Sequence, residues 1–108
     1  MSLPDLTHLQ FLVLGLLLDT PQAGRQIRAD LHTHGIRRTA PAFYQMMARL
    51  EDSGWVAGWY EQAVVDGQML KERHYRLLPA GRREWMATRD FYAVRLRGLS
   101  PAREPARG

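Results

Sequence analysis

Residues 39–78, TAPAFYQMMARLEDSGWVAGWYEQAVVDGQMLKERHYRLL, decide the fold of this 108-residue chain, and they begin with a helix. Thr39 can cap this helix, and Pro41 lies in its first turn, where a backbone N–H is not needed. Gly54 can adopt the positive φ that ends a helix. Three apolar residues at helical spacing predict one buried face: Phe43, Met47 and Leu50. The opposite, polar face and its edge consist of Gln45, Arg49, Asp52 and Tyr44.

Two strand-like runs follow this helix, at residues 55–61 and 72–78, and a loop that contains Asp66-Gly67 joins them. A helix with a polar, partly basic face beside a β-hairpin is the layout of a winged helix-turn-helix. Such a module places its helix in a DNA major groove and its hairpin against the backbone. We therefore predict a mostly helical α+β fold, in which a winged helix-turn-helix is followed by a C-terminal dimerisation helix.

Composition limits the class of protein. A chain of 108 residues forms one domain and buries only ~65% of its unfolded surface, so a partner chain would add to its stability. Cysteine is absent, which excludes disulfides, thiolate metal sites and cysteine nucleophiles. The longest apolar run, residues 11–18, is far shorter than the ~20 residues that cross a bilayer, and no signal peptide precedes it. We predict a cytoplasmic protein that does not contact a membrane.

Basic residues are unevenly distributed along the chain. The formal net charge is +4, and 14 arginines contrast with a single lysine, Lys71. A GC-rich genome would explain the number of arginines as well as nucleic-acid binding does, so their positions are more informative. Residues 25–49 hold five arginines against one acid, and residues 80–98 hold five against two, whereas residues 61–76 are balanced. The basic region thus covers the predicted second and third helices, as a DNA-binding protein requires.

The segments before residue 39 predict two further helices. Residues 9–18 are apolar on nearly every side, so a helix there must be buried all round, which in a small domain indicates that a second chain covers part of it. Asp5 or Thr7 is its expected cap. The pair Thr20-Pro21 is typical of a helix start, and we predict a second helix at about residues 23–34 that Gly35 ends. Its buried stripe consists of Ala23, Ile27 and Leu31.

The final helix is predicted to begin at Pro79 and to end at about residue 96 or 98. Its apolar surface is wide, because Trp85, Tyr92 and Leu99 lie seven positions apart and other apolar residues flank them. We predict that this helix packs against another subunit; docking over the hairpin strands is the alternative. The predicted parts of the chain are the winged helix-turn-helix, the dimerisation helix and a disordered tail, at residues 1–78, 79–99 and 100–108.

Several spaced motifs between residues 8 and 92 resemble the PadR-type transcriptional regulators, in their compact branch with one C-terminal helix. The matching segments are Leu14-Gly15-Leu16-Leu17, Phe43-Tyr44, Arg49-Leu50-Glu51, Gly54-Trp55-Val56, Arg73-His74-Tyr75-Arg76-Leu77 and Ala80-Gly81. Two segments depart from the family pattern. Residues 23–27 read AGRQI where the family has HGYEI, and residues 39–44 read TAPAFY where it has SPGTLY, so the hydroxyl at position 42 is missing.

The resemblance implies a homodimeric repressor whose final helices form the dimer and which binds double-stranded DNA at an inverted-repeat operator. Some relatives respond to phenolic acids or planar drugs, so the resemblance also allows a small aromatic effector. If there is one, Trp85 on the dimer helix is the residue that we expect to contact it. The alternative is that Trp85, like Trp55 and Trp59, only packs in the protein interior.

Eight residues are predicted to contact DNA: Arg37, Arg38, Thr39, Tyr44, Gln45, Arg49, Lys71 and Arg73. The first two precede the third helix and suit phosphate contacts, and Tyr44 would donate to a phosphate from the start of that helix. Gln45 suits the paired donor and acceptor of adenine, and Arg49 suits guanine or a phosphate. Three alternatives remain open from sequence: a half-buried Tyr44, a surface ion pair for Arg49 and a structural role for Arg73.

Other classes of function have little support in the sequence. The spacing His32-x-His34 could supply two metal ligands, but no acidic or cysteine cluster completes a site, so we predict neither a metal nor a cofactor. No glycine-rich phosphate loop occurs, and no base accompanies Ser53, so we predict that the protein is not an enzyme. The rival prediction is a winged-helix module that binds another protein and not DNA. An acidic or apolar third helix would favour it, whereas this helix is polar and follows a basic segment.

Overall fold

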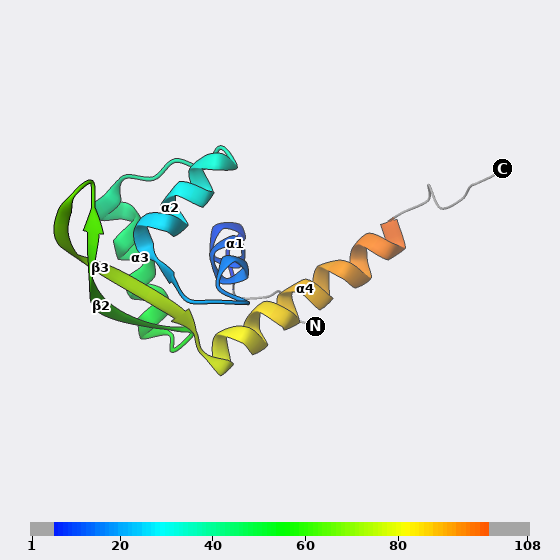
Figure 1. The fold of residues 1–108 in the computed structure, drawn as a ribbon. Coiled ribbons are helices and arrows are strands. Elements are labelled where there is room, and N and C mark those ends of the chain that lie inside the picture. Colours follow the sequence, from blue (N-terminus) through cyan, green and yellow to red (C-terminus); the bar gives the residue numbers. More distant parts are fainter. Residues whose placement is uncertain (1–5, 100–108) are drawn as a thin grey trace.

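The structure, a computed structural model, describes residues 6–99 and consists of four helices beside a three-stranded antiparallel sheet (Figure 1). The elements are α1 (His8–Leu16), β1 (Gln22–Ala23), α2 (Gly24–Thr33), α3 (Ala40–Asp52), β2 (Val56–Val65), β3 (Gln68–Leu77) and α4 (Pro79–Leu99). The first three helices gather beside the β2–β3 hairpin, and α4 leaves from the base of the hairpin and extends away from them. The predicted winged helix-turn-helix is confirmed.

The third helix, α3, forms for the reasons visible in its sequence. The Thr39 hydroxyl accepts a hydrogen bond from the backbone N–H of Ala42 at 3.2 Å, which caps the helix. Gly54 follows the helix with a φ of 76°, a conformation that costs other residues strain. The predicted inner face is buried completely at Phe43, Met47 and Leu50. The polar face is therefore left at the surface of the domain.

The hairpin is longer than the sequence predicted. β2 and β3 each contain ten residues and pair continuously from Val56↔Leu77 to Val65↔Gln68. The expected loop around residues 62–71 was wrong, because Asp66 and Gly67 both adopt positive φ and close the hairpin in a two-residue turn. The strand pairing can therefore continue up to the turn itself.

A third strand, β1, escaped prediction and explains a second error. Its two residues pair with β3, at Gln22↔Tyr75 and Ala23↔His74, and two residues are too few to show an alternating pattern. Because this segment is extended, Thr20-Pro21 does not start a helix. α2 begins at Gly24, close to the predicted residue 23, and its N-cap residue Ala23 makes no side-chain cap bond. The first helix is capped as expected by Thr7, in a reciprocal arrangement with Gln10. The other candidate cap, Asp5, lies outside the described residues.

One hydrophobic core joins the elements of the domain. Its fully buried members come from α1, α2, α3 and both long strands: Val13, Leu14, Ile27, Phe43, Met47, Leu50, Val56 and Tyr75. Other apolar residues of α1 pack against this core but stay only partly buried: Leu9, Phe11, Leu12 and Leu16. The largely apolar helix α1 is thus incompletely covered by its own chain.

The first half of α4 docks on α1, not on the hairpin strands that were the alternative prediction. Trp85 stacks on Phe11 with ring centroids 5.2 Å apart, and an Arg82 guanidinium donates to the Leu18 carbonyl at 2.7 Å. Beyond Trp85 the helix exposes apolar side chains, among them Tyr92, Val94 and Leu96. The side chain of Leu99 and the predicted tail at residues 100–108 lie outside the description. In the described part of the chain, no helix has the length and apolarity to cross a membrane.

Candidate nucleic-acid interface

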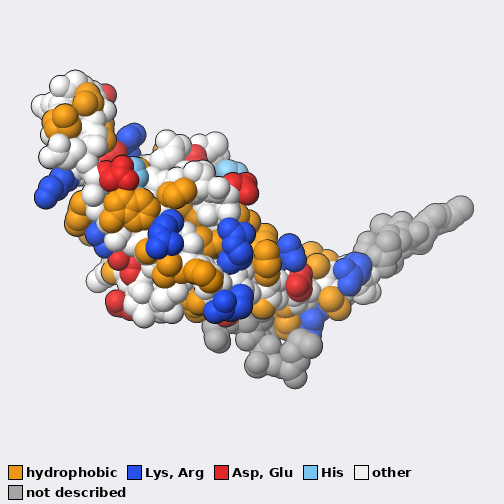
Figure 2. Space-filling model, turned by 60° about the horizontal axis from the view of Figure 1, so that its bottom comes forward, with side chains coloured by type: hydrophobic (Ala, Val, Ile, Leu, Met, Phe, Trp, Pro, Cys, Tyr) orange, Lys and Arg blue, Asp and Glu red, His pale blue; other side chains and the backbone are white. Residues whose placement is uncertain are grey.

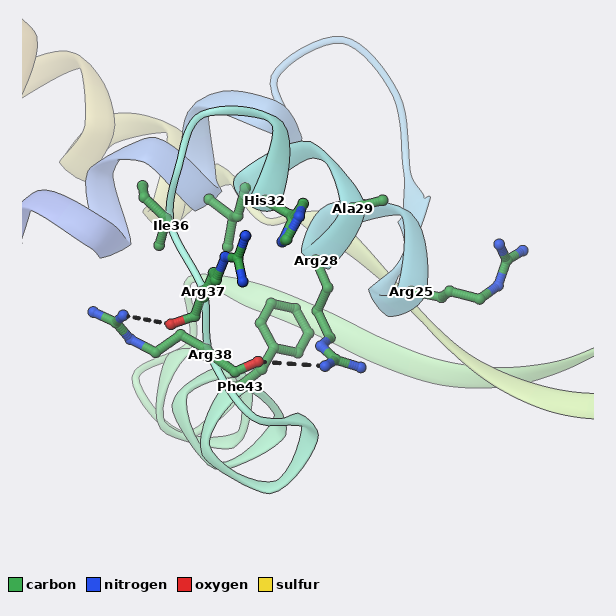
Figure 3. A pocket seen from close by; sticks show the side chains of 9 residues that line it. Arg25, Arg28, Ala29, His32, Ile36, Arg37, Arg38 and Phe43 are labelled. Carbon is green, nitrogen blue, oxygen red and sulfur yellow. Dashed lines mark hydrogen bonds between the residues drawn. The ribbon is translucent and has the colours of Figure 1, made fainter.

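The surface around the start of α3 carries most of the residues that we predicted to contact DNA. Arg37 and Arg38 lie on the segment that connects α2 to α3 (Figure 3) and are exposed, as is Thr39 after them. Gln45 and Arg49 are exposed on α3, four residues apart and therefore on one side of it. The connecting segment and the helix together present a basic and hydrogen-bonding surface to solvent. No described carboxylate forms an ion pair with Arg49, which removes the support for its alternative role.

Tyr44 is half-buried, as the alternative interpretation held. Its ring meets Phe43 edge-on, with centroids 5.0 Å apart, and it packs against the core. It also lies against Gly24 at the start of α2, so closely that a Cβ at this glycine would be 2.7 Å from Tyr44 Cε1. Gly24 therefore allows the two helices of the helix-turn-helix to approach each other. Tyr44 fixes their packing and still lines the groove beside α3.

The hairpin presents Lys71 to solvent but holds Arg73 in a structural contact. The Arg73 Nη2 atom lies 2.6 Å from Glu51 Oε1 on α3. Its guanidinium also lies 4.8 Å from the ring centroid of Tyr60 and 5.9 Å from that of Tyr75. Burial lowers the pKa of Arg73. The hydrogen bond to Glu51 and the charge of that carboxylate together outweigh this effect, so the pKa of Arg73 is raised overall. This geometry favours the structural role for Arg73 that the sequence left open.

A groove of about 810 Å³ is lined by residues of the hairpin, α2 and α3. Three tyrosines line it, at positions 44, 60 and 75, together with Arg25, Arg28 and Lys71. Tyr60 was not among the predicted site residues, although it is 63% exposed on the wall of this groove. Its position depends on the strand register, which sets Tyr60 opposite Arg73, and the sequence alone does not give that register. Glu51 and Glu72 partly neutralise the groove by pairing with Arg73 and Arg25.

The wider surface is basic and partly apolar. Figure 2 shows Lys and Arg side chains spread over the body of the domain and continuing along α4, with hydrophobic side chains between them. Exposed apolar residues also occur near the end of the hairpin, where Val64, Met69 and Leu70 lie. Both kinds of surface are therefore available to partners, the basic one to polyanions and the apolar one to other protein surfaces.

The three tryptophans all pack against their own chain. Trp85 stacks on Phe11 in α1, and Trp59 stacks on His74 while its Nε1 donates to Glu61 at 2.6 Å. Trp55 packs against the core. The Trp85 Nε1 atom is buried without a hydrogen-bond partner among the described residues. These contacts favour the packing interpretation over an effector site for the tryptophans.

The burial of Tyr75 predicts that the stability of the folded protein changes with pH in the alkaline range. Burial raises the pKa of Tyr75 to about 12, and the Glu51 carboxylate contributes in the same direction, whereas Arg73 opposes it. Because the folded state prefers the neutral phenol, this stabilisation is complete below the unfolded pKa of about 10 and is lost as the pH rises from about 10 to about 12.

We expect the free energy of unfolding of Tyr75→Phe, measured by urea denaturation between pH 9 and pH 12, to fall less steeply than that of the wild type. Tyr60→Phe removes an exposed hydroxyl from the same groove and is the control, which should follow the wild-type curve. Parallel curves for Tyr75→Phe and the wild type would contradict the assignment.

Solved structures share this arrangement of helices and hairpin. A PadR-family transcriptional regulator from Eggerthella lenta is 28% identical, over 91% of this chain and 83% of that chain, with a TM-score of 0.65. A PadR-like transcription factor from Bacteroides fragilis is 15% identical, over 85% and 86%, with a TM-score of 0.69. Bacillus subtilis PadR, solved in complex with operator DNA, is 20% identical over 75% of this chain, with a TM-score of 0.60.

The present chain spans only about half of the Bacillus protein, 47% of that chain. No protein-family model matches the sequence, and no curated protein matches it significantly. All three structures are named as regulators or factors of transcription or as PadR itself, and none as an enzyme.

Proposed function

We propose that this chain, whose fold is that of the PadR-like winged-helix structures, regulates transcription by binding double-stranded DNA. The observation that carries the proposal is the exposed polar face of α3, with Gln45 and Arg49, directly after the exposed pair Arg37-Arg38. This arrangement suits a helix that enters a major groove while the preceding segment binds the backbone. The Bacillus PadR, which was solved in complex with operator DNA, supports the same proposal.

Within this proposal the contacts divide into those that position the protein and those that read sequence. Arg37, Arg38 and Lys71 are exposed cations suited to phosphates, which fix the register of the protein on the duplex. Gln45 and Arg49 are suited to base edges in the major groove. Arg73 is assigned to neither group, because Glu51 holds it. Its role is to keep the hairpin in place beside α3.

We further propose that the protein acts as a homodimeric repressor. A second copy would cover the apolar surface that one chain leaves exposed on α4, at Tyr92, Val94 and Leu96, and the partly buried residues of α1. A two-fold axis would place two α3 helices about one turn of DNA apart, ~34 Å, so the operator is expected to be a near-palindrome. Release by a small aromatic effector stays a prediction. A ligand at Trp85 would have to displace Phe11 or use a surface that a second subunit completes.

The test of sequence reading begins with selection of preferred duplexes from a random pool by the wild-type protein. In Gln45→Ala the preference should relax at one base pair per half-site, by about 1–3 kcal/mol of discrimination. Arg37→Ala and Arg38→Ala should instead weaken binding to all sequences alike and reduce the slope of log affinity against log salt. Arg83→Ala removes the same charge from an exposed site on α4 and is the control. An unchanged preference in Gln45→Ala would show that another face reads the bases.

The same measurements separate the proposal from the rival function, a winged-helix module that binds protein. A phosphate-binding protein loses affinity for random duplex DNA steeply as salt increases, because counterions are released on binding. A module that binds only protein would show neither the affinity nor the salt dependence. The polar α3 and its basic surroundings favour DNA.

A further inference from the structure

A second cavity, of about 270 Å³, lies between α2, the connecting segment and the start of α3 (Figure 3). One side of it is apolar and consists of Leu31, Ile36 and Phe43. The rest is basic and consists of Arg25, Arg28, His32, Arg37 and Arg38, with Ala29 between them. The cavity is smaller than the pockets that hold drug-sized ligands, so its shape suits a small group.

The arginines of this cavity are not matched by acids. Arg25 is the exception, since it points away from the cavity and pairs with Glu72 at 3.1 Å. Arg28 Nη2 donates to the Arg38 carbonyl at 3.3 Å, and Arg38 Nη1 donates to the Arg37 carbonyl at 2.9 Å. Among residues 6–99, no carboxylate forms an ion pair with any of these three arginines. Backbone carbonyls order the guanidinium groups but do not cancel their charge.

Arg28 also holds a donor that the protein does not use. Its Nε atom is buried and has no hydrogen-bond partner in the described part of the chain. In Figure 3 the Arg28 and Arg37 side chains reach toward the cavity on either side of the Phe43 ring, while Arg38 points away. An unpaired buried donor destabilises the protein, and no described carboxylate offsets the charges of Arg28 and Arg37. A bound anion would offset these charges.

We propose that this cavity is a phosphate-binding pocket, in which Arg28 and Arg37 hold a doubly charged phosphate group. Each guanidinium offers two parallel N–H groups that match two phosphate oxygens. The apolar side at Ile36 and Phe43 can contact a small uncharged group of a phosphate monoester. The ligand class is therefore inorganic phosphate or a small phosphate monoester.

The DNA backbone also consists of phosphate groups, and the pocket lies beside the residues that we assign to contacts with them. A free phosphate ligand would then compete with the backbone for Arg28 and Arg37 and lower the affinity for DNA. This regulatory consequence rests on the proposed DNA binding, whereas the pocket itself does not. The two claims can therefore be tested separately.

The test is titration of the full chain with inorganic phosphate at about pH 8, in a phosphate-free buffer and with ionic strength held constant by sodium chloride. We expect saturable NMR shifts of the backbone amides of residues 36–39 and of the Arg28 Nε–H signal. Arg28→Gln should weaken phosphate binding about tenfold or more, as loss of a charge-assisted hydrogen bond implies. Arg37→Gln should do the same at an exposed position where folding is not at risk. Arg83→Gln, the control on α4, should change binding less than about twofold.

The second part of the test measures the affinity of the same variants for random duplex DNA. If Arg28→Gln and Arg37→Gln weaken both phosphate and DNA relative to Arg83→Gln, the pocket serves the backbone and free phosphate alike. If only phosphate binding weakens, the pocket is specific for free ligands. Either result supports the pocket. The pocket would be excluded if the wild type showed no saturable NMR shifts with phosphate. It would also be excluded if Arg28→Gln and Arg37→Gln both bound phosphate as the wild type does, whatever the DNA measurement shows.

Discussion

The Gly81→Ala variant is expected to melt at a markedly lower temperature than the wild type. A Cβ at this position would lie 2.1 Å from the Trp55 carbonyl oxygen and 2.9 Å from Leu77 Cδ1. The oxygen cannot swing aside, because it belongs to the backbone and accepts a hydrogen bond from the Leu78 N–H at 2.9 Å. The start of α4 must therefore move away from the hairpin, at a cost of about 2–3 kcal/mol, the upper part of the range for overpacked sites.

For a domain of this size, such a loss lowers the melting temperature by roughly 10–20 °C. The control is Gly98→Ala in the same helix, where nothing lies within 4 Å of the added Cβ. Because alanine favours helices more than glycine does, this variant should match or slightly exceed the wild type. All three proteins should be compared at one concentration, since association shifts apparent stability. Equal melting of the two variants would show that α4 does not pack where the structure places it.

The Leu96→Glu variant is expected to convert the proposed homodimer into a monomer. Leu96 is 63% exposed in the single chain, so the substitution costs the isolated fold little. In a dimer that buries α4, it would place a charge in an apolar interface, and two-fold symmetry would place it there twice. An unpaired buried charge costs about 3–5 kcal/mol, so the dissociation constant should rise at least about a thousandfold.

Sedimentation equilibrium at several concentrations measures this change. Leu70→Glu is the matched control, because it makes the same substitution at another exposed leucine, on β3, and should leave the dimer intact. Deletion of residues 84–108 would test the dimer less clearly, because it would also remove the stacking of Trp85 on Phe11 of α1 within one chain. The substitution changes only the proposed interface. A dimer that persists in Leu96→Glu would exclude the outer half of α4 from the interface.

The sequence predicts the parts of this fold that depend on near neighbours. The cap at Thr39, the spacing of Phe43, Met47 and Leu50 and the stop at Gly54 are all local, and α3 forms as they indicate. The same helical spacing places Gln45 on the exposed face. The contacts of this face with DNA belong to the proposed function.

The remaining features depend on residues that are distant in sequence. Tyr44 is half-buried because Gly24, twenty positions earlier, leaves room for its ring, and Arg73 is held by Glu51, twenty-two positions away. β1 is defined only by its pairing with β3. No spacing within one segment reveals such contacts, which explains why the structural role of Arg73 stayed open from sequence.

The two ion pairs at the hairpin hold its base against the helices, and its end extends beyond them. Adjacent residues of β3 are tied to different helices, Arg73 to Glu51 on α3 and Glu72 to Arg25 on α2. Four further residue pairs, from Gln62↔Lys71 to Val65↔Gln68, extend past these ties, a length of about 13 Å. In the proposed complex with DNA, the base of the hairpin would keep a constant distance from α3, while its end would be able to bend and follow grooves of different width.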